Sequence, residues 1–319
     1  ARVGVGELGR QGRPNALARL FPAEPVLIGV GFAMMVIGLA YAMAEYDLRR
    51  AAASGLTAQT GVCVALIGLG SPLALAAAEG HALTAVFAFV ALQLALGAVL
   101  GRRGSVRASE LEGVSRTMPL TATLLLLSGL AVAGAPLFAS YTTISIALEA
   151  MAQWELQWAW TLIACVPAGL FAALCLRPAL AAFHGVAQRT PIHEAPFPML
   201  LSTAIAVFFC FSIGVAPAWL YGLLPSALAF DPFAIDRLAP HLSLLGATGV
   251  ALIALRATKL APTERSVRLM DVDALYRGPI AGAGRWLGVV MLRIYGTAQD
   301  LAQQQAASAG RVVMRWVRA

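Results

Sequence analysis

Residues 118–148 read MPLTATLLLLSGLAVAGAPLFASYTTISIAL, an apolar stretch that Gly134-Ala135-Pro136 interrupts near its middle. Roughly 20 apolar residues are enough for a helix to cross the hydrocarbon core of a bilayer, so this stretch is too long for one straight crossing. Proline removes a helical N–H donor, and glycine adds backbone freedom. The stretch therefore predicts a discontinuous membrane helix, with one half over Met118–Ala133 and the other over Ser140–Ala150.

Six further apolar stretches have the composition of membrane spans. In chain order they are Val26–Ala44, Leu56–Ala76, Ala82–Leu100, Trp158–Leu176, Phe197–Trp219 and Leu242–Leu255. Hydrophobic residues make up 59% of the chain and charged residues 12%, against about 45–50% and about 25% in soluble domains. A soluble fold cannot bury so much apolar surface. We therefore expect an all-α integral membrane protein with about seven transmembrane helices, one of them discontinuous.

The basic residues predict how the chain crosses the membrane. If the loop after the first span is cytoplasmic, that side receives Arg49, Arg50, Arg102, Arg103, Arg107, Arg116, Arg177, Arg189, Arg256, Lys259, Arg265 and Arg268, whereas the opposite loops hold only Arg237. The positive-inside rule then predicts a multi-pass protein of the cell inner (plasma) membrane with a cytoplasmic carboxyl terminus. Arginines that cluster between apolar runs are typical of membrane loops, so we expect no nucleic acid as a partner.

The composition divides the chain into four parts. Residues 1–25 precede the membrane, and their arginines fall on the wrong side unless they belong to an amphipathic segment or to a loop of a preceding region. Residues 26–257 form the transmembrane bundle, and residues 258–283 are a polar cytoplasmic linker. Residues 284–319 alternate apolar and polar side chains, which predicts an amphipathic helix on the membrane surface or against another protein of a complex. A solvated tail is the alternative.

Patterns typical of soluble catalytic sites are missing from the sequence. It has no phosphate-binding loop, no paired cysteines and no zinc-protease motif, and its four cysteines lie within apolar runs as packing residues. We therefore predict no metal and no cofactor. The lack of a nucleophile–base pair favours a transporter subunit over an enzyme.

Ionisable residues at membrane depth are costly, which makes them candidates for function. We expect Glu79 and His81 at the junction of the second and third spans, close enough to pair; both could instead reach headgroup water. Glu149 lies near the end of the second half-helix, where it could also cap the helix in solvent. Gln59 and Gln93 are polar within spans, and Gln93 is a candidate for hydrogen bonding between helices.

The break itself is the most informative feature, because it leaves backbone groups that must meet protein or water inside the membrane. Such breaks often line ion paths. The predicted ion-path residues are Glu79, His81, Tyr141, Thr142, Thr143 and Glu149, with Gly134 and Pro136 forming the helix break.

Several motifs occur in an order that matches a known family. They are Tyr46–Arg50 followed by Ala53, Gln59 and Gly61; His81–Thr84; Glu110–Val114 with Met118-Pro119; and Gly134–Ala139, which is similar to the broken-helix pattern G-x-P-P-F-A-G-F-x-S-K. Over roughly residues 20–280 the chain resembles the proton-conducting subunits shared by respiratory complex I and the multisubunit Mrp-type cation/proton antiporters. Leu220–Pro225 and Asp271–Arg277 resemble the D-type subunit of the Mrp-type antiporters. The resemblance implies the carboxyl-terminal half of a longer subunit, without the first inverted repeat.

The departures from the family pattern bear on function. Ala85 stands where the resemblance implies a buried lysine, and Thr143-Ile144 stands where it implies Ser-Lys. A buried lysine can relay protons because desolvation lowers its pKa, whereas alanine and isoleucine cannot. The resemblance therefore implies that this half is degenerate in proton conduction.

We expect a membrane subunit of a multisubunit cation/proton antiporter-like or complex I-like ion-translocating assembly. Its partners would be other membrane subunits and the lipid bilayer, and the candidate ion is a monovalent cation or a proton. The alternative is a non-transporting membrane scaffold that anchors a soluble catalytic partner through Arg285–Arg318, as in a hydrogenase-like or carbon-uptake-like complex.

Overall fold

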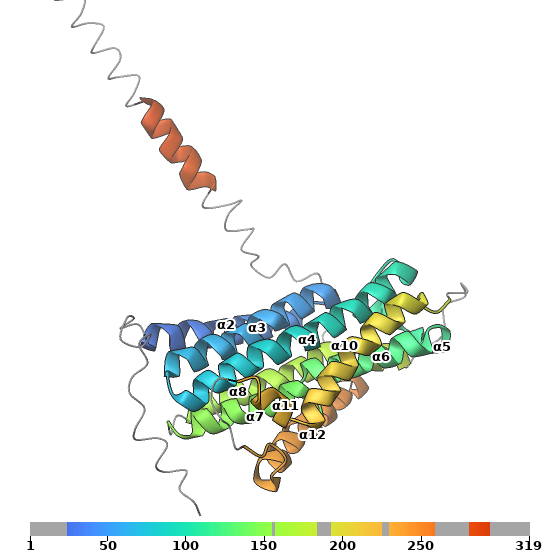
Figure 1. Cartoon of the computed structure of the whole chain (residues 1–319). Coiled ribbons are helices and arrows are strands. Elements are labelled where there is room, and N and C mark those ends of the chain that lie inside the picture. The colour runs from blue at the N-terminus through green and yellow to red at the C-terminus, as the bar shows by residue number, and fades with distance from the viewer. Residues whose placement is uncertain (1–23, 155–156, 184–192, 225–229, 259–280, 294–319) are drawn as a thin grey trace, which may run out of the picture. The chain divides into compact units, whose positions relative to one another are not determined.

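The computed structural model describes residues 24–154, 157–183, 193–224, 230–258 and 281–293. The chain divides into two compact units, Ala1–Arg265 and Ser266–Ala319. The first unit holds the bundle of helices labelled in Figure 1. The described part of the second unit is one helix over residues 281–293, and the rest of the predicted segment 284–319 lies outside the described residues.

The described part of the first unit is built from helices joined by loops. In chain order these are α2 (Glu24–Ala44), α3 (Leu48–Leu69), α4 (Pro72–Arg103), η1 (Ala108–Leu111), α5 (Val114–Thr117), α6 (Pro119–Val132), α7 (Ala139–Ala152), α8 (Gln157–Leu170), η2 (Phe171–Leu176), α9 (Arg177–Phe183), α10 (Phe197–Val215), α11 (Ala218–Tyr221) and α12 (Ile235–Ala257). Among the described residues, six segments are long and apolar enough to cross a membrane, and α6 is a shorter apolar helix. The all-α membrane fold is confirmed, and the broken helix appears as α6 and α7.

The loop predicted around residues 77–81 lies instead at Gly70-Ser71. Gly70 has a φ of 64°, a left-handed conformation that glycine adopts readily at the end of a helix. Ser71 caps α4 through its side chain, and Pro72 is the first helical residue. The alanine-rich start of α4 then continues without a break. Glu79 and His81 therefore lie inside α4, and their predicted position at a span junction is wrong.

Small residues allow α2 and α3 to approach closely. A Cβ atom added at Gly31 would lie 2.4 Å from the backbone nitrogen of Ala65, and one added at Gly38 would lie 2.6 Å from that of Ala58. Lipid gives helices no hydrophobic reason to associate, so this backbone contact supplies the packing energy. Figure 1 shows α2, α3 and α4 side by side in the bundle.

Loops from distant parts of the chain meet at one end of the bundle, which we call the basic end because the described arginines of the predicted cytoplasmic loops lie there. A backbone bridge joins Asp47 to Arg107, and Arg177 donates to the carbonyl oxygens of Ala42 and Glu45 at 3.1 and 2.8 Å. These contacts bring the end of α2, the loop after α4 and the start of α9 together. Asp47, Arg107 and Arg177 therefore lie at one end of the bundle.

Three helices of the bundle leave much of their surface uncovered by the described chain. Only 28% of the apolar window is buried in α2 and in α10, and 11% in α12. Large apolar side chains such as Phe208 and Val250 are exposed there. Such faces need lipid or another membrane subunit, since water would not solvate them.

Candidate functional site

The break between α6 and α7 is a turn of unusual backbone conformation. Gly134 has a φ of 63°, and Leu137 has a φ of 76°, which is uncommon for a residue with a side chain. The packing around the turn holds this conformation. Gly214 of α10 lies so close that a Cβ atom there would be 2.2 Å from the carbonyl oxygen of Leu137.

Side chains from two other helices bind carbonyl groups that the break leaves free. Gln59 of α3 donates from Nε2 to the carbonyl oxygen of Val132 at 3.1 Å. His241 of α12 contacts the carbonyl oxygen of Gly134 through Nε2 at 2.8 Å. A carbonyl oxygen only accepts, so Nε2 of His241 carries a proton. Protein groups therefore satisfy these positions, as the membrane interior demands.

His81 links α3, α4 and α7 in a buried polar cluster. Its Nδ1 lies 2.9 Å from Oγ1 of Thr143, and its Nε2 makes a short hydrogen bond with Oε1 of Gln59. Oγ1 of Thr84 lies 3.1 Å from that of Thr143. Together with the Gln59 bond to Val132, this cluster ties the end of α6 and the start of α7 to their neighbours.

The cluster can accommodate His81 in two protonation states. With a neutral ring, Nε2–H donates to Gln59, and the Thr143 hydroxyl donates to Nδ1. With a charged ring, Nδ1–H donates to Thr143, whose hydroxyl can turn to the carbonyl oxygen of Ser140, 3.1 Å away. Rotation of one hydroxyl therefore completes the hydrogen bonding in either state.

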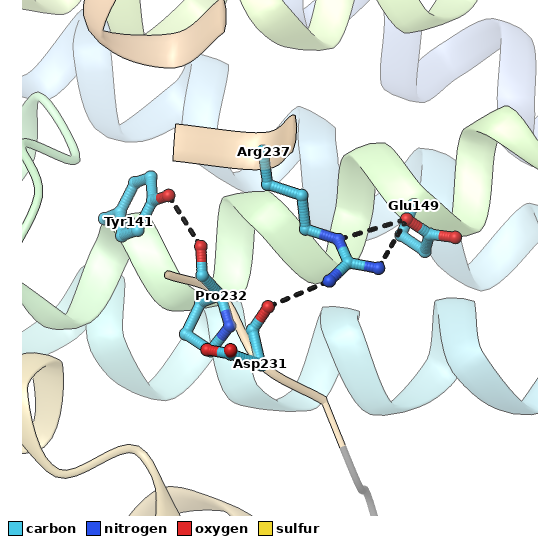
Figure 2. Close-up of polar contacts among 5 residues, drawn as sticks. All are labelled: Tyr141, Glu149, Asp231, Pro232 and Arg237. Carbon is cyan, nitrogen blue, oxygen red and sulfur yellow. Dashed lines mark hydrogen bonds and ion pairs between the residues drawn. The ribbon is translucent and has the colours of Figure 1, made fainter. Parts of the chain in front are cut away.

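The predicted ion-path residues do not all come together. Glu79 is exposed whereas His81 is fully buried, and both His81 nitrogens bind other groups, so the predicted Glu79–His81 pair is wrong. Tyr141 donates its hydroxyl to the carbonyl oxygen of Pro232 at 2.7 Å (Figure 2). Oγ1 of Thr142 is buried without a hydrogen-bond partner among the described residues.

Glu149 lies at the other end of this region, in a partly exposed ion pair. Its carboxylate is 3.3 Å from Arg237, which also donates to the carbonyl oxygen of Asp231 at 2.9 Å (Figure 2). Glu149, Arg237 and His241 line a cavity of about 170 Å³, together with Asp236. The cavity reaches from this charged mouth to His241, which binds the break. The ring of Tyr141 packs edge-on against His241, with centroids 5.0 Å apart.

Tyr221 is another ionisable group of this region, in the short helix α11. Burial raises the pKa of its hydroxyl from 10.0 to about 12, and the nearby carboxylate of Asp231 adds to the shift. The phenol therefore stays protonated at physiological pH. It supplies no group that exchanges protons near neutrality.

Buried apolar side chains occupy the two positions where the family pattern implies lysine. Ala85 is 5% exposed and Ile144 is fully buried, so neither position offers a group that can bind a proton. The described residues also contain no cluster of three or more histidine, cysteine, aspartate or glutamate side chains that could hold a metal ion.

His241, Asp236 and Arg237 were not among the predicted site residues. The predicted span Leu242–Leu255 began too late, since α12 starts at Ile235 and includes all three. The charged pair Asp236-Arg237, with the acidic residue in the first turn, is a signal of a helix start that would have extended the span. Gln59 was noted as polar within a span, but its partner lies 73 residues away.

Comparisons with known proteins place this geometry in a family context. Residues 18–170 match the family model described as NADH:quinone oxidoreductase/Mrp antiporter, TM. Over these residues the chain is an antiporter-like membrane protein of the complex I and Mrp type. The matched residues include α2 to α7, and so the broken helix and the His81 cluster.

Relatives of this antiporter-like chain occur both among complex I proteins and among cation/proton antiporters. It is 30% identical over 140 residues to NADH-ubiquinone oxidoreductase chain 5 of Paracentrotus lividus, covering 43% of this chain and 22% of that protein. It is 28% identical over 204 residues to the A/B-type subunit of a probable K⁺/H⁺ antiporter of Rhizobium meliloti (strain 1021), covering 60% of this chain and 20% of that protein. The chain thus matches about a fifth of the length of these two relatives.

A solved structure has the same fold. A chain in the Mrp complex from Dietzia sp. DQ12-45-1b aligns with a TM-score of 0.60 and 19% identity, over 70% of this chain and 50% of that chain. At this identity the likeness concerns the fold alone. It agrees with a chain that spans about half of an antiporter-like subunit.

Proposed function

We propose that this antiporter-like chain is a membrane subunit of a multisubunit cation/proton antiporter-like or complex I-like assembly, and that this half of the subunit conducts few or no protons. The observation that carries the proposal is that protein side chains, rather than the lysines of a proton relay, occupy the helix break. Gln59 and His241 occupy the carbonyl groups of Val132 and Gly134, while alanine and isoleucine fill the two lysine positions.

The polar groups that remain support a structural role for the break. His81 and His241 each bind one side of it, and both are buried. A proton relay needs consecutive groups that gain and lose protons within hydrogen-bonding reach. Beyond the His81 cluster, the next group is the carbonyl oxygen of Val132, which does not titrate. Glu79, Tyr141, Thr142, Thr143 and Glu149 remain candidates for a residual path.

We further propose that the protein lies in the inner membrane, with the basic end and the carboxyl terminus in the cytoplasm. The excess of arginine in alternate loops supports this orientation. Labelling of single cysteines tests this placement, in a background whose four cysteines are replaced by serine. A cysteine at Arg102 should react with an impermeant maleimide only in inside-out vesicles, and one at Asp231 only in right-side-out cells. The reverse pattern would contradict the orientation.

Purification of the tagged chain from its native membranes tests the proposed membership of a complex. We expect it to co-purify with other hydrophobic antiporter-like proteins. Recovery of the chain alone, under conditions that keep membrane complexes intact, would contradict the proposal.

A scaffold that anchors a soluble enzyme is the second candidate. The helix over residues 281–293 favours it, because Trp286, Leu287, Met291 and Leu292 are all exposed by half or more and would suit a partner or a lipid surface. The same purification separates the two candidates, since a large soluble enzyme as the main partner would favour the scaffold.

A further inference from the structure

A cavity of about 170 Å³ lies between α7, α8 and α12, where the Glu149–Arg237 ion pair forms its charged mouth. Its volume is roughly that of five or six water molecules in the liquid, which leaves room for a small organic molecule. Part of the wall is apolar and consists of Leu148, Trp160, Ala164 and Leu244. The other lining groups are polar, and their arrangement indicates which kind of molecule fits.

The polar lining forms two layers. Glu149 and Arg237 make the outer layer at the mouth, and Ser145 and His241 make the inner layer. Ser145 precedes Glu149 by four residues on α7, and His241 follows Arg237 by four residues on α12. The layers therefore lie about 6 Å apart, since a helix rises about 1.5 Å per residue.

The inner layer offers hydrogen-bond acceptors to the cavity. The hydroxyl of Ser145 donates to the carbonyl oxygen of Tyr141 at 2.9 Å, so its oxygen can still accept. The Nε2–H group of His241 donates to the carbonyl oxygen of Gly134, so Nδ1 is an acceptor, and no described residue binds it. His241 is only 6% exposed. A buried acceptor without a partner favours a ligand that can donate to it.

The mouth of the cavity carries a net negative charge. Two nitrogens of Arg237 contact Oε2 of Glu149, and no described residue donates to Oε1. The same guanidinium donates to the carbonyl oxygen of Asp231 (Figure 2), and it lies 4.4 Å from the ring centroid of Phe230, so it is held in place. Asp236 also lines the cavity, beside this neutral pair, and forms no ion pair with the described residues. The mouth therefore favours a cation.

We propose that this cavity binds a short amino alcohol, with its ammonium group between Asp236 and Oε1 of Glu149 and its hydroxyl donating to Nδ1 of His241. A chain of about four carbon atoms spans the distance of about 6 Å between the layers and packs against the apolar wall. Charge-assisted hydrogen bonds hold the ammonium group. A hydrogen bond to Nδ1 keeps the proton on Nε2, so the bound ligand also maintains the contact between His241 and the break.

Saturation-transfer difference NMR of the purified full chain in deuterated detergent tests this site, and it does not require the proposed complex. The probes are 4-amino-1-butanol, butylamine and 1,4-diaminobutane at neutral pH and constant ionic strength, with potassium ions as a competitor. The amino alcohol should bind most tightly. Butylamine should bind about ten-fold more weakly, because it leaves Nδ1 of His241 without a donor. The diamine should also bind more weakly, because its second charge meets no carboxylate in the inner layer.

Two variants test the lining itself. Asp236→Asn should lower the affinity for 4-amino-1-butanol about ten-fold, since it removes the net charge of the mouth. Ala164→Leu should lower it as well, because leucine fills the space of the alkyl chain while the polar groups remain. Asp231→Asn is the matched control. Asp231 is also exposed at this end of the bundle but does not line the cavity, so its replacement should leave the affinity unchanged.

Three results would overturn the proposal. Equal losses in Asp236→Asn and Asp231→Asn would reduce the effect to general surface charge. Affinities for butylamine or 1,4-diaminobutane that equal that of 4-amino-1-butanol would show that no ligand hydroxyl binds His241. Displacement of the amino alcohol by potassium ions at a similar concentration would show a site for inorganic cations instead.

Discussion

Replacing Gln59 by leucine removes the side chain that joins the break to the His81 cluster. Leucine has nearly the same size but forms no hydrogen bonds, so the carbonyl oxygen of Val132 and Nε2 of His81 both lose a partner. Hydrogen bonds between membrane helices contribute about 0.6 kcal/mol on average and up to about 1.7 kcal/mol each. Two such losses predict a destabilisation of about 1–3 kcal/mol.

Gln93→Leu makes the same chemical change at an exposed position of α4. Leucine at this exposed site leaves no buried group unpaired, so we expect a stability within about 0.5 kcal/mol of the wild type, or a small gain. The measurement is the free energy of unfolding in mixed detergent–SDS micelles, followed by far-ultraviolet circular dichroism. If Gln59→Leu were as well tolerated as Gln93→Leu, Gln59 would not hold the break.

Two further predictions concern packing and the charged mouth. Gly214→Ala places a methyl group against the backbone of Leu137 and should destabilise the protein by about 1–3 kcal/mol, whereas Gly97→Ala, which meets nothing within 4 Å, should be neutral or stabilising in the same assay; the opposite order would show that α10 does not pack on the break. Glu149→Gln removes a partly exposed ion pair with Arg237 and should lower stability by only about 0.5 kcal/mol at low salt, with the difference vanishing at about 1 M salt because surface pairs are screened. A salt-independent loss would point to a buried role for Glu149.

The break itself could be predicted because its signal is local. Glycine and proline interrupt an apolar run that is too long for one crossing, and α6 and α7 end within one or two residues of the predicted bounds. The loop between α3 and α4 was equally local, since Gly70, Ser71 and Pro72 are the residues that end and start helices. Hydropathy alone did not reveal this loop, because the residues before it and the alanines after it are all apolar.

The partners of the break could not be predicted from the sequence. Gln59 and His241 lie 73 and 107 residues from the carbonyl groups that they bind, so only the packing of α3 and α12 brings them there. The expected pair of Glu79 and His81 failed for a geometric reason. Residues two apart on one helix point in different directions, so Glu79 faces outward while His81 faces the core.

Proton flux through the reconstituted assembly, with and without His81→Asn, tests the central claim most directly. Asparagine can keep a hydrogen bond toward Thr143 but cannot take up a proton near neutral pH. If this half of the protein does not conduct protons, the flux measured with a pH-sensitive dye in proteoliposomes should equal that of the wild-type assembly. A loss on the order of 100-fold, the size expected when a proton-transfer group is removed, would show that protons pass through the break.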